Sequence, residues 1–270
     1  MFRLTLEYDG TAFHGWQRQP GVRTVEGVLR DALSALGLQV ERISAAGRTD
    51  AGAHAHGQIV GLTLSEGIPA ESAERPMCSE RTMSPERPKN ISSERLRGAL
   101  NAVLPPDVTI AAAAEVPAGF DARRDALTRT YRYLVLQRST RPAVARQYAW
   151  QVRGPLDLAA MRRAARLLVG THDFAAFGTS PRPGGTTTRT VHTVRVRRVG
   201  TAILIDVSAD AFLYGMMRSF AGALVSIGEG RLTHAELHTL ITHPPAQRAN
   251  LTVAPAHGLH QWAVTYPETR

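Results

Sequence analysis

The chain has 270 residues, enough to bury a large core in one large domain or in two domains of ordinary size. Its formal net charge of +9 excludes a surface of balanced charge and predicts a polyanionic partner, either nucleic acid or an acidic membrane surface. A single cysteine, Cys78, excludes disulfides within the chain, and the absence of a long apolar run or a signal peptide predicts a cytoplasmic protein without a membrane partner.

The first half predicts two β-α-β units separated by a loop, the split arrangement of a ferredoxin-like domain. Alternating apolar residues indicate the strands, and residues that cap helices precede both helical patterns. Phe13 and Trp16 follow a turn and are either core side chains, which is the default interpretation, or groups that stack on bases. The predicted elements are strand 2–8, helix 25–36, strand 40–44, strand 58–64, a helix from residue 92 or 93 to 104, and strand 108–112.

Residues 65–92 interrupt this regularity with few large apolar side chains and a loose recurrence of Ser, Glu, Arg and Pro. We expect a flexible insertion there. We therefore place an N-terminal ferredoxin-like domain at 1–115, which includes the insertion, and a C-terminal ferredoxin-like domain at 116–270. The predicted fold class is α+β.

The second half repeats this order of elements without a detectable sequence repeat. Asp157 is suited to cap a helix, and Gly200 lies at the predicted turn of a hairpin. The predicted elements are strand 130–137, helix 158–168, strands 191–199 and 202–207, helix 212–227 and strand 261–266.

The segment AAGRTDAGAHA at 45–55 suits neither a helix nor the interior of a strand. Gly47 and Gly52 bracket a charged pair and supply the backbone freedom of a tight loop. Because this loop lies between two predicted strands, it presents Asp50 as a candidate for chemistry. The alternative is that the Asp50 carboxylate only accepts hydrogen bonds from the backbone of its own turn.

Two tyrosines and two arginines are further candidates from their surroundings. Tyr131 and Tyr133 lie on one face of a strand, so that one can line a site while the other packs, or both can belong to the core. Arg218 is a charge in an apolar stretch and either pairs with a carboxylate or faces solvent. Arg48, two residues before Asp50, either binds a phosphate or is a solvated charge.

The sequence does not support a metal site. His54 and His56 are two residues apart near Asp50, but no second cluster supplies the missing ligands at a recognisable spacing. Phosphate-binding loops, dinucleotide fingerprints and zinc-deaminase motifs are also absent from the sequence. We therefore expect neither a metal nor a bound cofactor.

Several of these motifs resemble those of the TruA-type tRNA pseudouridine synthases. The segments GRTDAGAHAHGQ, YDGTAFHGWQ, TRTYRY, HDFAAF and FLYGMMRS match the family's motifs in order and spacing over nearly the whole chain. Three positions and one segment differ: Ala53 replaces the usual Val, Met217 and Ser219 replace Val and Asn, and His260-Gln261-Trp262 departs from an apolar pattern.

The resemblance implies an enzyme that isomerises uridine to pseudouridine at positions 38, 39 and 40 of the tRNA anticodon stem-loop. It implies that Asp50 is the catalytic carboxylate, that Arg218 pairs with it, and that Tyr131 stacks on the target base with its hydroxyl placed to assist removal of the C5 proton. It implies that Arg48 binds RNA. It also implies two domains whose antiparallel sheets join beside a central basic cleft, and a homodimer.

Two questions stay open at the level of sequence. Asp50 either attacks the uracil ring or the sugar carbon, or it abstracts a sugar proton to form a glycal. The second question is the function itself, because a non-catalytic tRNA-binding or RNA-remodelling protein on the same fold would show the same basic cleft. The intact set of Arg48, Asp50, Tyr131 and Arg218 favours the enzyme.

Overall fold

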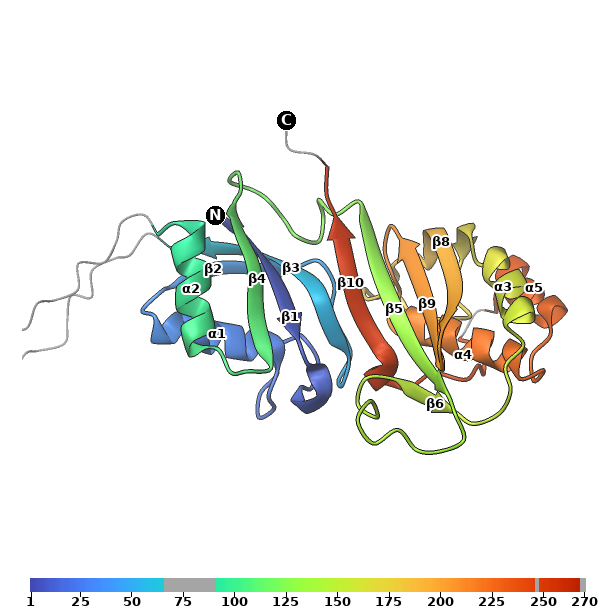
Figure 1. Cartoon of the computed structure of the whole chain (residues 1–270). Helices are drawn as coiled ribbons and strands as arrows, with labels where there is room; N and C mark the ends of the chain where they lie inside the picture. The colour runs from blue at the N-terminus through green and yellow to red at the C-terminus, as the bar shows by residue number, and fades with distance from the viewer. Residues whose placement is uncertain (66–90, 246–247, 268–270) are drawn as a thin grey trace, which may run out of the picture.

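A computed structural model describes residues 1–65, 91–245 and 248–267 of the chain. All but the ends of the predicted insertion at 65–92 lies outside these residues, as does Cys78. Within the described residues one ten-stranded sheet runs through the molecule, with α1 and α2 at one end and α3, α4 and α5 at the other (Figure 1). None of the helices described is long and apolar enough to cross a membrane.

The N-terminal half forms the predicted elements. Thr24 and Ser92 cap the two helices, each accepting a hydrogen bond from a backbone N–H three residues on. The third strand begins earlier than predicted and is buried along most of its length, because its side chains belong to two clusters: Val60 and Leu62 to the core with α1 and α2, and Ile59 to a smaller one with Ala46 and Ala122. The elements are β1 (Phe2–Tyr8), α1 (Val25–Ala35), β2 (Val40–Ala45), β3 (His54–Leu64), α2 (Ser93–Val103) and β4 (Val108–Glu115).

The C-terminal half contains the predicted strands together with three elements that the sequence did not indicate, β6, β7 and α5. Two of these are strands of three and four residues, too short to show an alternating pattern. The elements are β5 (Thr128–Gln137), β6 (Trp150–Val152), α3 (Leu158–Leu167), β7 (Gly170–Asp173), β8 (Thr188–Val199), β9 (Ala202–Ala209), α4 (Met216–Gly228), α5 (His234–Thr242) and β10 (Leu259–Thr265).

The start of α4 corrects one prediction. The apolar pattern placed the helix from residue 212, but it begins at Met216. Gly215 has φ of +76°, outside the helical region, and the backbone of Tyr214 forms a bridge with Thr179 through N–O distances of 2.9 and 3.3 Å. Phe212 therefore belongs to a loop that leads into the helix.

The last strand joins the two halves of the sheet. β10 pairs in parallel with β3 and antiparallel with β5, and Gln261 lies opposite both Ala55 and Tyr131. One hydrophobic core lies between β1, β3, α1 and α2, and a second lies between β5, β9, α3 and α4. The α+β fold with joined, mostly antiparallel sheets is confirmed, while the domain boundary near residue 115 stays a prediction.

Two helical glycines allow a test of this packing. A Cβ at Gly222 in α4 would overlap the carbonyl oxygen of Thr252, whereas a Cβ at Gly98 in α2 would meet no atom within 4 Å. We expect Gly222→Ala to lower the free energy of unfolding by about 1–3 kcal/mol through overpacking. We expect Gly98→Ala to raise it by roughly 0.5–1 kcal/mol through helix propensity.

Urea unfolding of the two variants beside the wild type measures both effects. Equal changes of the same sign in the two variants would show that α4 does not pack against the 252 segment as described.

Candidate active site

The loop between β2 and β3 is held against the N-terminal segment. Backbone N–H groups of Trp16 and Gly52 donate to the carbonyls of Thr49 and Phe13, both at 3.1 Å, and the hydroxyls of Tyr8 and Thr49 lie 2.7 Å apart. Phe13 and Trp16 are 3% and 2% exposed, which confirms the default prediction that both are core side chains. The two N-terminal motifs therefore build one structure.

The two glycines of this loop serve different purposes. Gly52 has φ of +78°, as the predicted tight loop requires. Gly47 lies outside the left-handed region and is needed for space instead, because a Cβ there would lie 2.7 Å from the hydroxyl oxygen of Tyr131. The loop therefore passes directly against the candidate tyrosine.

Asp50 and Arg218 form an ion pair across the two halves of the chain. The Arg218 Nη1 donates to Asp50 Oδ2 at 2.8 Å, and the two side chains are 25% and 10% exposed. Arg218 Nε donates to the carbonyl of Ala254 at 2.7 Å, and the N–H of Ala254 donates to the carbonyl of Arg218 at 3.1 Å. Arg218 is thus a paired charge, rather than one that faces solvent.

Tyr131 and Tyr133 have separate environments on one face of β5. The Tyr133 hydroxyl donates to the carbonyl of Pro255 at 2.6 Å, and its side chain is fully buried in the core. Tyr131 lines the cleft, and its ring meets Phe212 edge-on with centroids 4.8 Å apart. Burial raises the pKa of Tyr131 to about 12, so that its hydroxyl is protonated at neutral pH.

A cleft of about 1080 Å³ brings these side chains together. Asp50, Tyr131 and Arg218 line it, together with Arg48, which is exposed at the loop. The structure thus gathers all four residues that the sequence singled out. Their placement is a fact of the fold, while their roles stay predictions.

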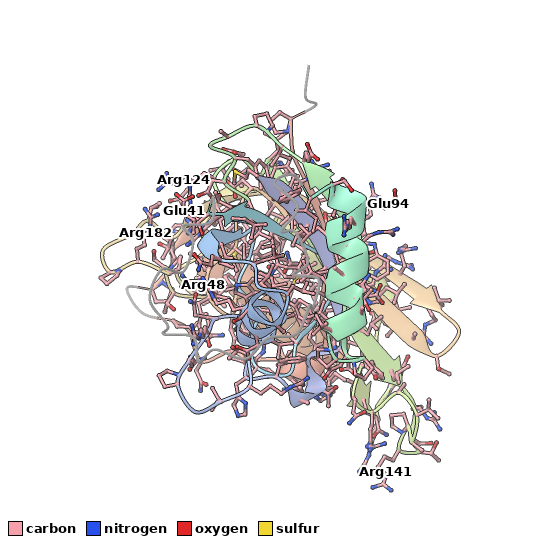
Figure 2. All side chains as sticks on the ribbon, turned by 90° about the vertical axis from the view of Figure 1, so that its left-hand side faces the viewer. Glu41, Arg48, Glu94, Arg124, Arg141 and Arg182 are labelled. Atoms are coloured by element: carbon pink, nitrogen blue, oxygen red, sulfur yellow. The ribbon has the colours of Figure 1, made fainter. Side chains whose placement is uncertain are left out.

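The cleft also contains arginines that the sequence analysis did not single out. They belong to two segments that line the cleft, 121–129 and 179–182, and are Arg123, Arg124, Arg129 and Arg182. Figure 2 shows Arg48, Arg124 and Arg182 on one side of the molecule, away from Arg141. Burial, and then the charges of Arg48 and Arg182, lower the pKa of Arg123. The adjacent Arg123-Arg124 pair was the signal available in the sequence.

The histidines near Asp50 are engaged by hydrogen bonds and by stacking with one another. His54 Nδ1 accepts a hydrogen bond from the N–H of Gly10 at 3.0 Å, and burial lowers the pKa of His54. Its ring stacks on His260, and His260 stacks in turn near His56, at centroid distances of 4.8 and 5.4 Å. Among the residues with described positions, no group of three possible ligands could hold a metal ion.

Comparisons with known proteins place the chain in a family. Residues 164–267 match the family model described as tRNA pseudouridine synthase. A protein of Methylobacterium nodulans called tRNA pseudouridine synthase A is 39% identical over 268 residues, which cover 99% of this chain and 96% of that protein. The chain belongs to the TruA-type tRNA pseudouridine synthases. A Frankia casuarinae protein with the same name is 40% identical and covers 98% of this chain and 89% of its own length.

The solved structures give a more distant likeness. One chain from the crystal structure of a Cbf5-Nop10-Gar1 complex aligns with 83% of this chain and 45% of its own length, at 12% identity and a TM-score of 0.38. The family assignment therefore rests on sequence relatives that span nearly the whole chain.

The histidine stack gives a prediction for stability in acid. His260 is 4% exposed, and burial, with smaller contributions from His54, His56 and Arg132, lowers its pKa to about 4. The unfolded chain then binds the proton more readily than the fold, so stability is complete above pH 6.5 and falls as the pH drops toward 4. We expect His260→Phe to lose less stability over this window than the wild type.

Urea unfolding of each protein at pH 7 and at pH 4.5 measures the difference, with each protein serving as its own reference. A wild type that is equally stable at both values would contradict the neutral, buried state of His260.

Proposed function

We propose that the chain isomerises uridine to pseudouridine in tRNA, at positions 38, 39 and 40 of the anticodon stem-loop. The observation that carries this proposal is the Asp50 carboxylate, paired with Arg218 and placed beside Tyr131 in a basic cleft. Relatives that are named tRNA pseudouridine synthase A and that match nearly the whole chain support the same reaction. The three positions come from the resemblance in sequence motifs.

The reaction exchanges one bond for another without net oxidation. The bond from the sugar carbon C1′ to N1 of uracil breaks, the uracil turns, and C1′ bonds to C5. The C5 hydrogen leaves to water as a proton and N1 takes up a proton, so that the product is an isomer of the substrate. Asp50 starts this sequence by attack on the ring or the sugar carbon, or by removal of a sugar proton. No electron acceptor is needed in any of these routes, so the proposed enzyme works without a cofactor.

We propose different tasks for the two carboxylate oxygens of Asp50. Arg218 holds Oδ2, and no hydrogen bond within the described residues holds Oδ1. In this proposal Oδ1 is the oxygen that meets the substrate. Arg218 fixes the direction of the carboxylate through this charge-assisted hydrogen bond.

Tyr131 serves the flipped base in two ways. Its ring lines the cleft and is held at its edge by Phe212, which suits it to stack on a uracil taken out of the RNA helix. Its raised pKa means that the hydroxyl takes part at neutral pH as a phenol. It can therefore direct the C5 proton through a hydrogen bond, while a phenolate base is not available.

The arginines at the cleft supply the affinity for RNA. Arg48 and Arg182 are close enough for their charges to oppose the charge of Arg123, and the Asp121 carboxylate partly offsets them there. RNA phosphates would relieve this repulsion, and guanidinium groups bind phosphate through two parallel hydrogen bonds. We propose that these arginines, Arg48 included, bind phosphates of the RNA backbone around the target uridine.

We also propose a homodimer that acts in the cytoplasm. The sheet face away from the helices of the C-terminal half keeps Leu134, Leu136 and Leu204 only half-buried, which leaves apolar surface for a second copy. The tRNA substrate supports the cytoplasm as the place of action.

Tritium release from tRNA labelled at C5 of uridine tests the reaction directly. We expect release with the wild type, and release below about one-thousandth of that rate with Asp50→Asn, because the substitution removes the carboxylate charge. tRNA affinity should stay within about threefold, because arginine contacts with phosphates supply it. The alternative, a non-catalytic tRNA-binding protein, predicts no release from either protein with tight binding in both.

A second prediction concerns the basic cleft. Arg123→Gln should weaken tRNA binding and reduce the slope of log K against log salt by about 0.7 to 0.9, the value for one lost phosphate contact. Arg141→Gln is the matched control, because Arg141 lies away from the other labelled arginines (Figure 2). Filter binding over a range of salt concentrations measures both slopes. Identical slopes for the two variants would remove Arg123 from the RNA-binding surface.

A further inference from the structure

Two fully buried glutamines meet beside the loop that carries Asp50. Gln58 belongs to β3 and Gln261 belongs to β10, and both side chains have 0% exposure. Neither has a part in the proposed chemistry. Burying a polar amide lowers stability unless its hydrogen bonds are made, and Gln261 Oε1 has no partner within the described residues. Packing alone therefore does not account for this pair.

The hydrogen bonds of this pair lead to one residue of the loop, Gly47. Gln58 Nε2 donates to the carbonyl of Gly47 at 2.6 Å, and the N–H of Gly47 donates to Gln58 Oε1 at 3.4 Å. Gln261 Nε2 donates to the same Oε1 at 2.9 Å. Gln58 thus holds both sides of Gly47, three residues before Asp50, and Gln261 fixes the orientation of the Gln58 amide.

The position of the pair in the sheet links the loop to the junction between the halves. Along one edge of β3, β2 pairs with residues 60–64 and β10 pairs with residues 54–55, so that Gln58 lies in the gap between them. The loop leaves β2 at this gap. Gln261 is opposite Tyr131 on the neighbouring strand, and a Cβ at Gly47 would lie 3.6 Å from both amide atoms of Gln261.

We infer that Gln261, acting through Gln58, is a positioning residue: it fixes the distance between the Asp50 loop, at Gly47, and Tyr131 in the cleft. The inference rests on the proposed isomerase function. The bond between the two amides comes from the C-terminal half, as Arg218 does, so β10 and α4 fix the loop at two separate points. Without the amide bond, Gly47 keeps its neighbours but loses its fixed distance from Tyr131. The carboxylate then meets the substrate less often in the reactive geometry.

The test uses Gln58→Met, Gln261→Met and the double variant, because methionine keeps the length of glutamine without its hydrogen bonds. We expect single-turnover tritium release to fall at least tenfold in Gln261→Met, while tRNA affinity stays within twofold. The double variant should be no more than about twofold slower than the slower single variant, because both substitutions break the same link. Gln137→Met is the control, because the Gln137 amide donates to the Gly154 carbonyl at 3.1 Å and neither residue lines the cleft. The rate of tritium release by this variant should equal that of the wild type.

Amide hydrogen exchange of residues 46–53 gives a readout that does not depend on activity. We expect faster exchange of this loop in Gln261→Met and unchanged exchange in Gln137→Met. Unchanged loop exchange, or a wild-type rate in Gln261→Met, would overturn the positioning role. A wild type that releases no tritium would instead overturn the proposed isomerase and, with it, the catalytic consequence of the link.

Discussion

The ion pair between Asp50 and Arg218 is the interaction on which the site depends. It joins residues 168 positions apart, one on a loop of the N-terminal half and one on the first turn of α4. Each partner is also fixed by its own half, since the loop bonds to the segment around Trp16 and the Arg218 side chain bonds to Ala254. The Asp50 and Arg218 side chains therefore have a defined arrangement in the cleft only when the two halves are joined.

The junction that brings these residues together contains few strand contacts. β10 contributes two residue pairs to β3, so side chains supply much of the remaining connection. Arg129 of β5 donates from Nε to the carbonyl of Ala46 at 3.2 Å and from Nη1 to the carbonyl of Asp210 at 2.6 Å. It links the start of the Asp50 loop to the C-terminal half, from the same side of the sheet as Tyr131.

The sequence predicted those features that depend on local physics. Alternation and capping residues placed most of the strands and helices, and spacing placed Tyr131 and Tyr133 on one face. The predicted start of α4 was wrong because Gly215 has a left-handed backbone conformation, so the helix begins after it although the apolar pattern begins at Phe212. Arg123 and Gln261 were not identified as site residues, because their neighbours come from distant segments that only the folded sheet brings together. The apolar pattern around Arg218 left two interpretations open, a charge paired with a carboxylate or one that faces solvent, and only the family motif favoured the pairing with Asp50.

A double-mutant cycle on the free energy of unfolding measures whether the Asp50–Arg218 ion pair joins the two halves. The proteins are Asp50→Asn, Arg218→Met and the double variant, compared with the wild type in urea. Each single substitution leaves one polar or charged partner without its counterpart, so the double variant should lose at least about 1 kcal/mol less than the sum of the two. Additivity within about 0.5 kcal/mol would contradict the account, because it would mean that the pair does not join the two halves.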